Sequence, residues 1–191
     1  MRLHEDGDAD AAHVAALLFE RGSSDIQQDL AQAEEWYERA VTRNTDPYIR
    51  YDLARVIIRR HHLAKQEPER LRRALEILEN LTQEHNAHAA LYLGAIHLDG
   101  TIVTRSLDRA EYFSRMADEQ GFPFALLLLS NIEFQRHHYF RGVYLRFRAA
   151  LRALVIFCRK ANDPRLAFMH KGVNINEFPA LHNPDTWYRF S

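Results

Sequence analysis

The stretch GAIHLDGTIVTRSLDRAEYFSRMADEQG, residues 94–121, carries the pattern from which the fold is predicted. An apolar segment ends at Gly100, a loop of six residues follows, and the next segment places small residues at Ala110 and Ala117. Glycine adopts the left-handed conformation that closes a helix. Alanine lets two helix backbones approach closely, where a larger side chain would hold them apart. The stretch therefore predicts a helical hairpin in which the glycines and alanines serve packing.

The same pattern recurs along the chain. Residues 13–22 align with residues 90–100, and residues 29–41 align with residues 106–118. Equivalent small residues are separated by 38, 40 and 36 positions, at Ala16, Ala54, Gly94 and Ser130. This is the period of a two-helix solenoid unit, so the chain is expected to be an array of helical hairpins.

The second helix of a unit carries a more specific signature: leucine, alanine three positions later, and an aromatic residue after three more. The instances are Leu30, Ala33 and Trp36, and again Leu107, Ala110 and Phe113. The aromatic residues are expected to fill the space between successive hairpins. This pattern resembles the Sel-1-like repeat family, a branch of the tetratricopeptide-like helical repeats, over residues 10–160. The resemblance implies an all-α superhelix whose usual role is to hold other proteins.

The predicted fold class is an all-α superhelical solenoid of about four helix-turn-helix repeats with a C-terminal capping tail. The second repeat lacks the loop glycine, and the fourth loses the signature after Phe134. The expected boundaries are a solenoid over residues 1–160, with repeats at about 10–44, 46–85, 87–121 and 123–160, and an aromatic strap over 161–191.

Composition supports a folded soluble protein. The 191 residues are 47% hydrophobic and 27% charged with a net charge of −1, and the single cysteine, Cys158, excludes an internal disulfide. No apolar run reaches the length of about 18 residues that predicts a transmembrane helix. The acidic N-terminus has no signal-peptide core, so a cytoplasmic location is expected, with a removed signal or lipoprotein leader left open.

The segment 140–161 departs from the repeat pattern. At 100° per residue four arginines share one side: Arg141, Arg148, Arg152 and Arg159. We expect the apolar residues opposite them to face the previous hairpin; these are Val143, Phe147, Ala150, Leu151, Leu154, Phe157 and Cys158. A helix that is apolar on most sides is usually covered on most sides, so the tail, a second copy or a partner should pack here.

The tail, residues 162–191, combines three X-Pro turns with Phe168, Phe178, Trp187, Tyr188 and Phe190. It is too aromatic for a disordered segment. The tail either caps the open end of the solenoid or binds a partner, and a homodimer through the last helix or the tail is a further alternative.

Charge is unevenly distributed. Residues 1–40 hold ten acidic and three basic side chains, whereas residues 133–171 hold nine basic and two acidic ones. Such a distribution is typical of solvated helix faces, and it would also steer an acidic partner to the C-terminal end. The near-neutral total and the lack of a recognised module argue against nucleic acid as the partner.

Motifs for catalysis are missing from the sequence. It contains no H-E-x-x-H, P-loop, G-x-S-x-G or G-x-G-x-x-G motif. Among 11 histidines, only His85 and His88 have a spacing that would let them share a metal, and no cysteine pair or acidic partner accompanies them. Cys158 is expected to be an inert buried thiol. The sequence therefore predicts a protein that is not an enzyme and has no cofactor and no metal site.

The resemblance implies that first helices line a concave groove. Candidate partner-binding residues there are His13, Tyr51, Arg55, Tyr92, His97, Asn131 and Gln135, and the last helix adds Arg141, Arg148 and Arg152. The expected function is a protein-binding scaffold or adaptor that uses the groove, the C-terminal helix or both. The alternative is an immunity or antitoxin-like protein that neutralises a bacterial toxic effector. The sequence does not identify the partner.

Overall fold

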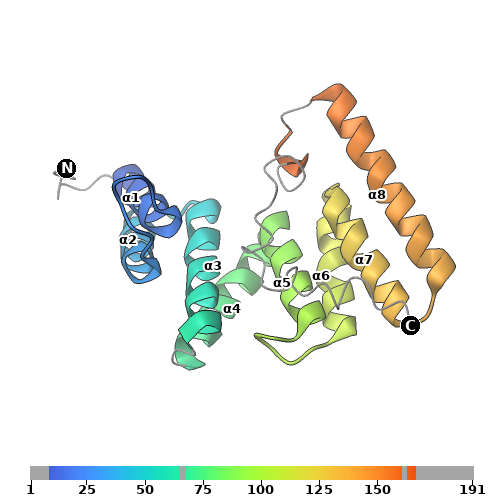
Figure 1. The fold of residues 1–191 in the computed structure, drawn as a ribbon, viewed down its shortest axis with the longest axis horizontal. Helices are drawn as coiled ribbons and strands as arrows, with labels where there is room; N and C mark the ends of the chain where they lie inside the picture. Colours follow the sequence, from blue (N-terminus) through green and yellow to red (C-terminus); the bar gives the residue numbers. More distant parts are fainter. Residues whose placement is uncertain (1–8, 65–67, 161–162, 167–191) are drawn as a thin grey trace. The chain divides into compact units, whose positions relative to one another are not determined.

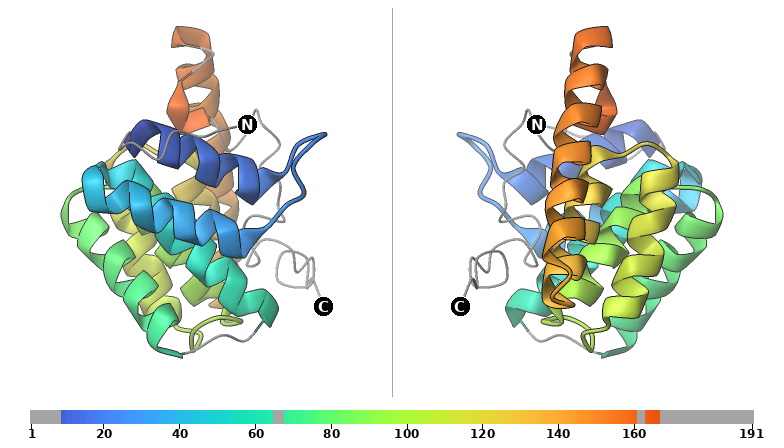
Figure 2. Two further views of the ribbon diagram at one scale, coloured as in Figure 1. Left: turned by 90° about the vertical axis from the view of Figure 1, so that its left-hand side faces the viewer. Right: turned by 90° about the vertical axis from the view of Figure 1, so that its right-hand side faces the viewer.

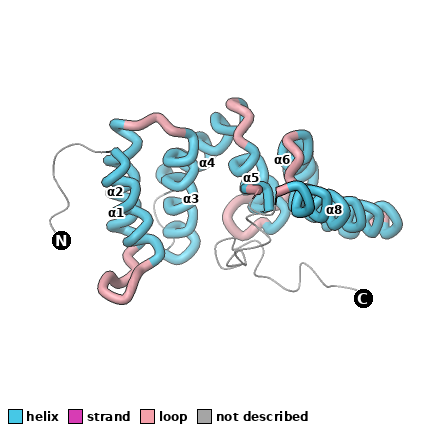
Figure 3. Tube along the Cα trace, turned by 90° about the horizontal axis from the view of Figure 1, so that it is seen from above, coloured by secondary structure: helices cyan, strands magenta, loops and turns pink. Residues whose placement is uncertain are grey.

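The computed structural model describes residues 9–64, 68–160 and 163–166, and its helices appear in chain order in Figure 1. Within these ranges the regular structure is entirely helical, as Figure 3 also shows. The helices are α1 (Ala9–Arg21), α2 (Leu30–Arg43), α3 (Pro47–Ala64), α4 (Pro68–Gln83), α5 (Ala87–Asp99), α6 (Leu107–Glu119), α7 (Pro123–Gln135) and α8 (Tyr139–Arg159), followed by the short 3-10 helix η1 (Pro164–Leu166).

The chain forms two compact units, residues 1–81 and 82–191. In the first unit α1 packs on α2 and α2 packs on α3. In the second, α5 packs on α6, α6 on α7 and α7 on α8, while η1 contacts α8. Successive helices thus pair as hairpins, as the repeat pattern predicts. The predicted strap lies outside the described residues except for residues 163–166.

The hairpins α1–α2 and α5–α6 close in the same way. Gly22 and Gly100 end α1 and α5 with φ values of 73° and 81°, in the left-handed region where glycine carries no steric penalty. In each hairpin the residue before the second helix donates a backbone hydrogen bond back to the first helix. Asp29 N bonds Phe19 O at 2.8 Å, and Ser106 N bonds His97 O at 3.0 Å.

The same two residues cap the helices that they precede. The Asp29 carboxylate accepts from the N–H groups of Ala31 and Gln32, and Ser106 Oγ accepts from the N–H of Arg109. An N-cap satisfies donors that have no partner inside the helix, which fixes the start of α2 and α6. The two loops, which differ by one residue in length, therefore begin and end in the same way.

Small residues make the helix contacts close. An ideal Cβ on Gly94 of α5 would lie 2.7 Å from Ser114 Oγ on α6, so this position has no room for a side chain. On α6, Ala110 and Ala117 are both 0% exposed, and on α2 so are Ala33 and Ala40. These buried pairs are seven residues apart and confirm that the alanines of the repeat serve packing.

The two aromatic residues of the signature differ in burial. Phe113 is buried, as expected. Trp36 is half-buried, and the guanidinium of Arg39 lies 4.5 Å from the centre of its ring. The neighbouring Tyr37 is 0% exposed and occupies the core of the first unit instead.

The fourth hairpin keeps more of the pattern than its sequence suggests. Its buried residues on α8 include Gly142, Leu145 and Ala149, and the spacing of seven between Gly142 and Ala149 matches that of Ala110 and Ala117. Ser130 Oγ on α7 donates a hydrogen bond of 2.8 Å to Gly142 O. The small residues on both helices therefore meet here too. The right-hand view of Figure 2 shows α7 beside α8.

Candidate functional site

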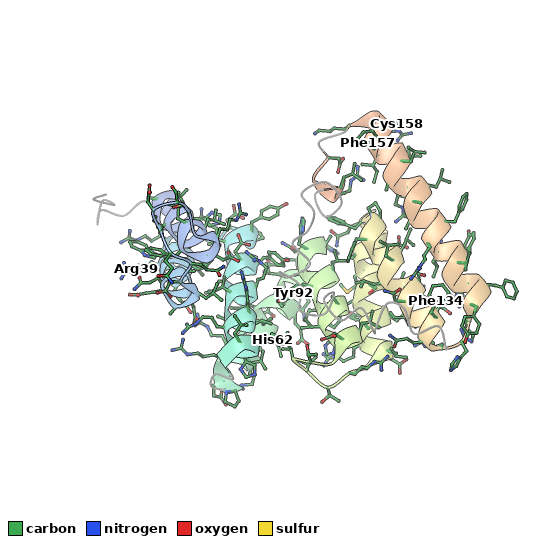
Figure 4. All side chains as sticks on the ribbon, viewed as in Figure 1. Arg39, His62, Tyr92, Phe134, Phe157 and Cys158 are labelled. Atoms are coloured by element: carbon green, nitrogen blue, oxygen red, sulfur yellow. The ribbon has the colours of Figure 1, made fainter. Side chains whose placement is uncertain are left out.

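The outer face of α8 exposes a continuous set of large apolar side chains. The exposed fraction of Phe140 is 96% and that of Phe147 is 67%. The other large apolar residues exposed on this helix are Val143, Tyr144, Leu151, Leu154, Val155 and Phe157. In Figure 4, Phe157 and Cys158 mark the C-terminal end of α8, and Phe134 marks its contact with α7. A contiguous apolar surface of this kind is typical of interaction sites on soluble proteins.

The predicted orientation of α8 is wrong. Val143, Phe147, Leu151, Leu154, Phe157 and Cys158 were expected to face the previous hairpin, and they are exposed. The same holds for Ala150. The face that packs on the rest of the unit consists of Gly142, Leu145, Ala149, Ala153 and Ile156. An added Cβ at Gly142 would lie 2.8 Å from the ring of Phe134, so the close contact selects small residues rather than the most apolar ones.

The exposed cysteine follows from this orientation. Cys158 was expected to be buried among core residues, and it lies on the outer face of α8. It is a free thiol in the described structure.

The arginines of α8 lie at the border between its two faces. Arg141 Nε lies 3.2 Å from Glu133 Oε1, and His138 Nδ1 lies 2.8 Å from the other oxygen of the same carboxylate. Arg152 pairs with Asp118, the carboxylate near the C-terminal end of α6. Arg148 extends over the ring of Tyr144, at 5.7 Å from its centre. Arg141 and Arg152 thus help to hold α8 on its own unit, and all three also border its exposed apolar face.

Three predicted first-helix residues lie in the first unit. Arg55 is buried and forms a two-pronged ion pair with Glu20, whose second oxygen lies 2.8 Å from Arg55 Nη2. His13 lies at the edge of this cluster, with Nε2 at 3.3 Å from Asp52 Oδ2. Tyr51 is 9% exposed. The structure thus brings His13 and Arg55 into one polar cluster that joins α1 to α3.

The electrostatics of this cluster follow from its burial. Burial raises the pKa of Tyr37 far above its ordinary value, and the carboxylates of Asp52 and Glu20 raise it further. Burial alone would lower the pKa of Arg55, but Glu20 and Asp52 outweigh it and raise this pKa. Both groups therefore keep one protonation state over the range in which proteins are folded. The arrangement is suited to holding α1, α2 and α3 together.

The predicted residues of the second unit are mostly interior. Tyr92, His97 and Asn131 are 0%, 5% and 5% exposed, and Gln135 is half-buried. The His97 ring stacks on Phe113 at 5.8 Å between ring centres, and Asn131 Oδ1 accepts a 3.1 Å hydrogen bond from Arg146 of α8. In this conformation these side chains present little surface to a partner. Their role in binding stays a prediction.

A charged pocket in the first unit was missed by the sequence reasoning. It encloses about 410 Å³ and is lined by Ala31, Glu34, Glu35, Glu38, Ile57, Arg60, Arg70 and Arg73 from α2, α3 and α4. Glu34 accepts from both Arg60 and Arg70, while Arg73 binds Glu38. The charged groups largely neutralise one another. The paired arginines and glutamates are 26 to 36 residues apart in the sequence, so no local motif predicts the pocket.

The described residues offer no group of three or more His, Cys, Asp or Glu side chains that could hold a metal ion. Of the two histidines with ligand spacing, His85 lies in a turn with φ 61°, and the ring of His88 contacts Phe122 edge-on at 5.0 Å.

Among the helices of the described ranges, none is both long and apolar enough to cross a bilayer.

Comparison with known proteins gives a consistent result. The Sel1 repeat family matches residues 9–44 and 87–122, the two hairpins whose loops begin at a glycine and end at an N-cap in the same way. No curated protein matches the chain. One similar crystal structure is a protective antigen of uropathogenic Escherichia coli strains that displays an SLR fold, with 17% identity and a TM-score of 0.56 over 96% of this chain and 40% of that protein.

A second similar structure is a Sel1 repeat protein from Oxalobacter formigenes, with 18% identity and a TM-score of 0.55 over 82% of this chain and 45% of that protein. The chain therefore spans less than half the length of either solved protein, and the likeness concerns the fold. Sel1-repeat proteins are usually non-catalytic, and their domains are typically interaction modules. Two repeats of this chain, residues 9–44 and 87–122, thus match the Sel1 repeat, and the chain is similar in fold to solved proteins of the SLR type, a tetratricopeptide-like helical-repeat fold.

Proposed function

We propose that this chain is a non-enzymatic protein-interaction module, a scaffold or adaptor, and that α8 provides its principal binding surface. The observation that carries the proposal is the exposed apolar face of α8, in which Phe140 and Phe147 are 96% and 67% exposed. Aromatic side chains of this size contribute strongly to interface energy when they are buried. Repeat arrays of this kind typically bind other proteins, which supports the same role here.

The first-helix residues that were predicted to bind a partner are weaker candidates. Tyr51, Arg55, Tyr92 and His97 are all buried in this conformation, so binding through them requires the packing of α3 or α5 to change. On α8 the aromatic side chains are already available to solvent. We therefore assign the main contact to α8 and leave an auxiliary contact to the partly exposed His13 and Gln135.

The test is capture of partners by the tagged full-length chain from a nuclease-treated lysate of the source organism, read by mass spectrometry. The informative variant is Leu151→Asp, because Leu151 is 50% exposed and its replacement should leave the fold intact. The matched control is Val14→Asp, an exposed apolar residue of α1. We expect one or more proteins to be retained by the wild type and the control and lost by the variant. Retention of the same proteins by Leu151→Asp would place binding elsewhere.

The same experiment separates the adaptor from the neutraliser. An adaptor is expected to retain several partners with moderate affinity. An immunity-like protein is expected to retain a single stoichiometric protein that survives extensive washing and whose toxic activity it abolishes. We rank the adaptor first.

A further inference from the structure

The exposed face of α8 has the spacing of a coiled-coil seam. Six exposed residues follow one another at intervals of four, three, four, three and four positions: Phe140, Tyr144, Phe147, Leu151, Leu154 and Cys158. An alternation of three and four gives a mean period of 3.5 residues, which keeps a stripe in register with a second helix wound along it. The seam extends over about 27 Å, nearly the whole length of the 21-residue helix.

This seam is not the contact by which the array packs α8. Gly142, Ala149 and Ile156 are buried against the rest of the unit, and each lies on the side of the helix opposite the seam. They too are spaced by seven residues. The helix thus carries two periodic faces, one of small residues occupied by its own unit and one of large residues exposed to solvent.

The edges of the seam differ in chemistry. Arg141 and Arg148 immediately follow Phe140 and Phe147, which places both at the e position of a heptad. On the other edge, the equivalent g positions are Val143 and Ala150. The Arg141 side chain is 59% exposed although it contacts Glu133. The whole of α8 contains five arginines and no carboxylate, so nothing on this helix neutralises that edge.

The heptad spacing of the seam and the arginines at its edge indicate what kind of partner it binds. We propose that the seam binds one amphipathic α-helix of a protein partner, with apolar residues at heptad spacing and Asp or Glu residues facing Arg141 and Arg148. Residues at e and g positions set partner choice in coiled coils through interhelical ion pairs. The proposal rests on the proposed function and adds the chemistry of the partner to it.

Charge argues against a second copy of this chain as the occupant. In an antiparallel pair of α8 helices, e positions face e positions, so the arginine-bearing edges would oppose each other. In a parallel pair, e positions face g positions, so Arg148 would meet Val143 or Ala150 and no carboxylate. A partner helix with acidic residues avoids both the repulsion between arginines and the lack of a carboxylate opposite Arg148.

The experiment uses the full-length chain and two synthetic three-heptad peptides with leucine at a and d. One carries glutamate at every e and g position, and the other carries lysine there. Like charges keep each peptide from pairing with itself. Fluorescence anisotropy of labelled peptide measures the dissociation constants, and circular dichroism verifies that each protein variant keeps its helix content.

We expect the glutamate peptide to bind about tenfold more tightly than the lysine peptide, a difference of about 1.4 kcal/mol. Phe147→Asp should abolish binding of both peptides. Arg148→Glu should remove or reverse the preference for glutamate. The matched charge control is Arg72→Glu in α4, an exposed arginine of the first unit, which should leave both constants unchanged.

Several results would overturn the proposal. Equal affinity for the two peptides would mean that the arginine edge of the seam does not select for acidic residues. Failure of both peptides to bind would exclude an amphipathic helix as the partner of the seam. A dimer in sedimentation equilibrium that Phe147→Asp dissociates would assign the seam to a second copy. Binding to phosphatidylserine vesicles that Phe147→Asp abolishes, without peptide selectivity, would assign it to a lipid surface. A synthetic peptide of residues 167–191 that displaces the glutamate peptide would assign it to the chain's own tail.

Failure of this inference is distinguishable from failure of the proposed function. If Leu151→Asp loses a captured partner while the glutamate peptide shows no advantage, α8 binds protein but not by an acidic helix. If capture does not depend on Leu151 while the peptide result holds, the seam is selective but is not the principal binding surface.

Discussion

Ser130 Oγ donates a hydrogen bond of 2.8 Å to the carbonyl oxygen of Gly142, and this contact joins α7 to α8. Gly142 leaves no room for a Cβ, because one would lie 2.8 to 2.9 Å from atoms of the Phe134 ring. The pair therefore determines which face of α8 is buried and, by consequence, which face remains exposed.

The first prediction concerns this contact. Gly142→Val adds branched bulk where the Phe134 ring already limits the space, so it should lower the free energy of unfolding by about 1–3 kcal/mol. The matched control is Ala150→Val on the exposed face of the same helix, which should change stability by less than about 0.5 kcal/mol. Urea denaturation followed by circular dichroism measures both. Equal stability of the two variants would contradict the close contact.

The second prediction concerns the helix pair α5–α6. Ala110 is 0% exposed, and its backbone carbonyl lies 3.4 Å from the place of a Cβ on Gly94. Ala110→Trp should destabilise the second unit by about 3 kcal/mol or more, since an indole cannot be accommodated without separating the helices. Thermal unfolding gives the effect. Tyr112→Trp, on a side chain that is 60% exposed, is the control and should leave the melting temperature nearly unchanged.

The repeat could be predicted from the sequence because its determinants are local. Gly22 and Gly100 close their helices, and Asp29 and Ser106 open the next ones, through bonds within a few residues. The orientation of α8 could not be predicted in the same way. Both of its faces are apolar, and the buried one was determined by the size of Gly142 and by its contact with Ser130, twelve residues earlier in the chain.

The candidate site, too, could be predicted only where its determinants are local in the sequence. The arginines of α8 were recognised because they are periodic, and the structure places Arg141 and Arg148 beside the exposed seam. The roles of Glu20 and Arg55 were not recognised, since they lie 35 residues apart and meet only when α1 and α3 come together. Arg55 was predicted as a binding residue because of its residue type, and the structure shows it in a buried ion pair.

The third prediction concerns this ion pair. Arg55→Met leaves the buried carboxylate of Glu20 without its main partner and should lower the free energy of unfolding by about 3–5 kcal/mol. The double variant Glu20→Gln with Arg55→Met should recover part of that loss, because no uncompensated charge remains. Equilibrium urea denaturation of the four proteins forms a double-mutant cycle. Additive losses would show that the two residues do not act as a pair.

The fourth prediction concerns alkaline pH. Tyr37 OH donates a 2.8 Å hydrogen bond to Glu20 Oε2, and burial raises the pKa of this phenol far above its ordinary value of 10.0, with Asp52 and Glu20 adding to the effect. A raised pKa in the folded state means that the folded chain keeps the proton after the unfolded chain has lost it. The contribution to stability is therefore complete below about pH 10 and decreases as the pH rises above that value.

The measurement is the free energy of unfolding between pH 8 and pH 11, about two units below and one unit above the ordinary tyrosine pKa. Tyr37→Phe removes the ionisable group, so its stability should decline less steeply with rising pH than that of the wild type. Tyr48→Phe, at a side chain that is 58% exposed, is the control and should follow the wild-type slope. If tyrosinate absorbance showed Tyr37 ionising near pH 10 in the folded protein, its burial against Glu20 would be contradicted.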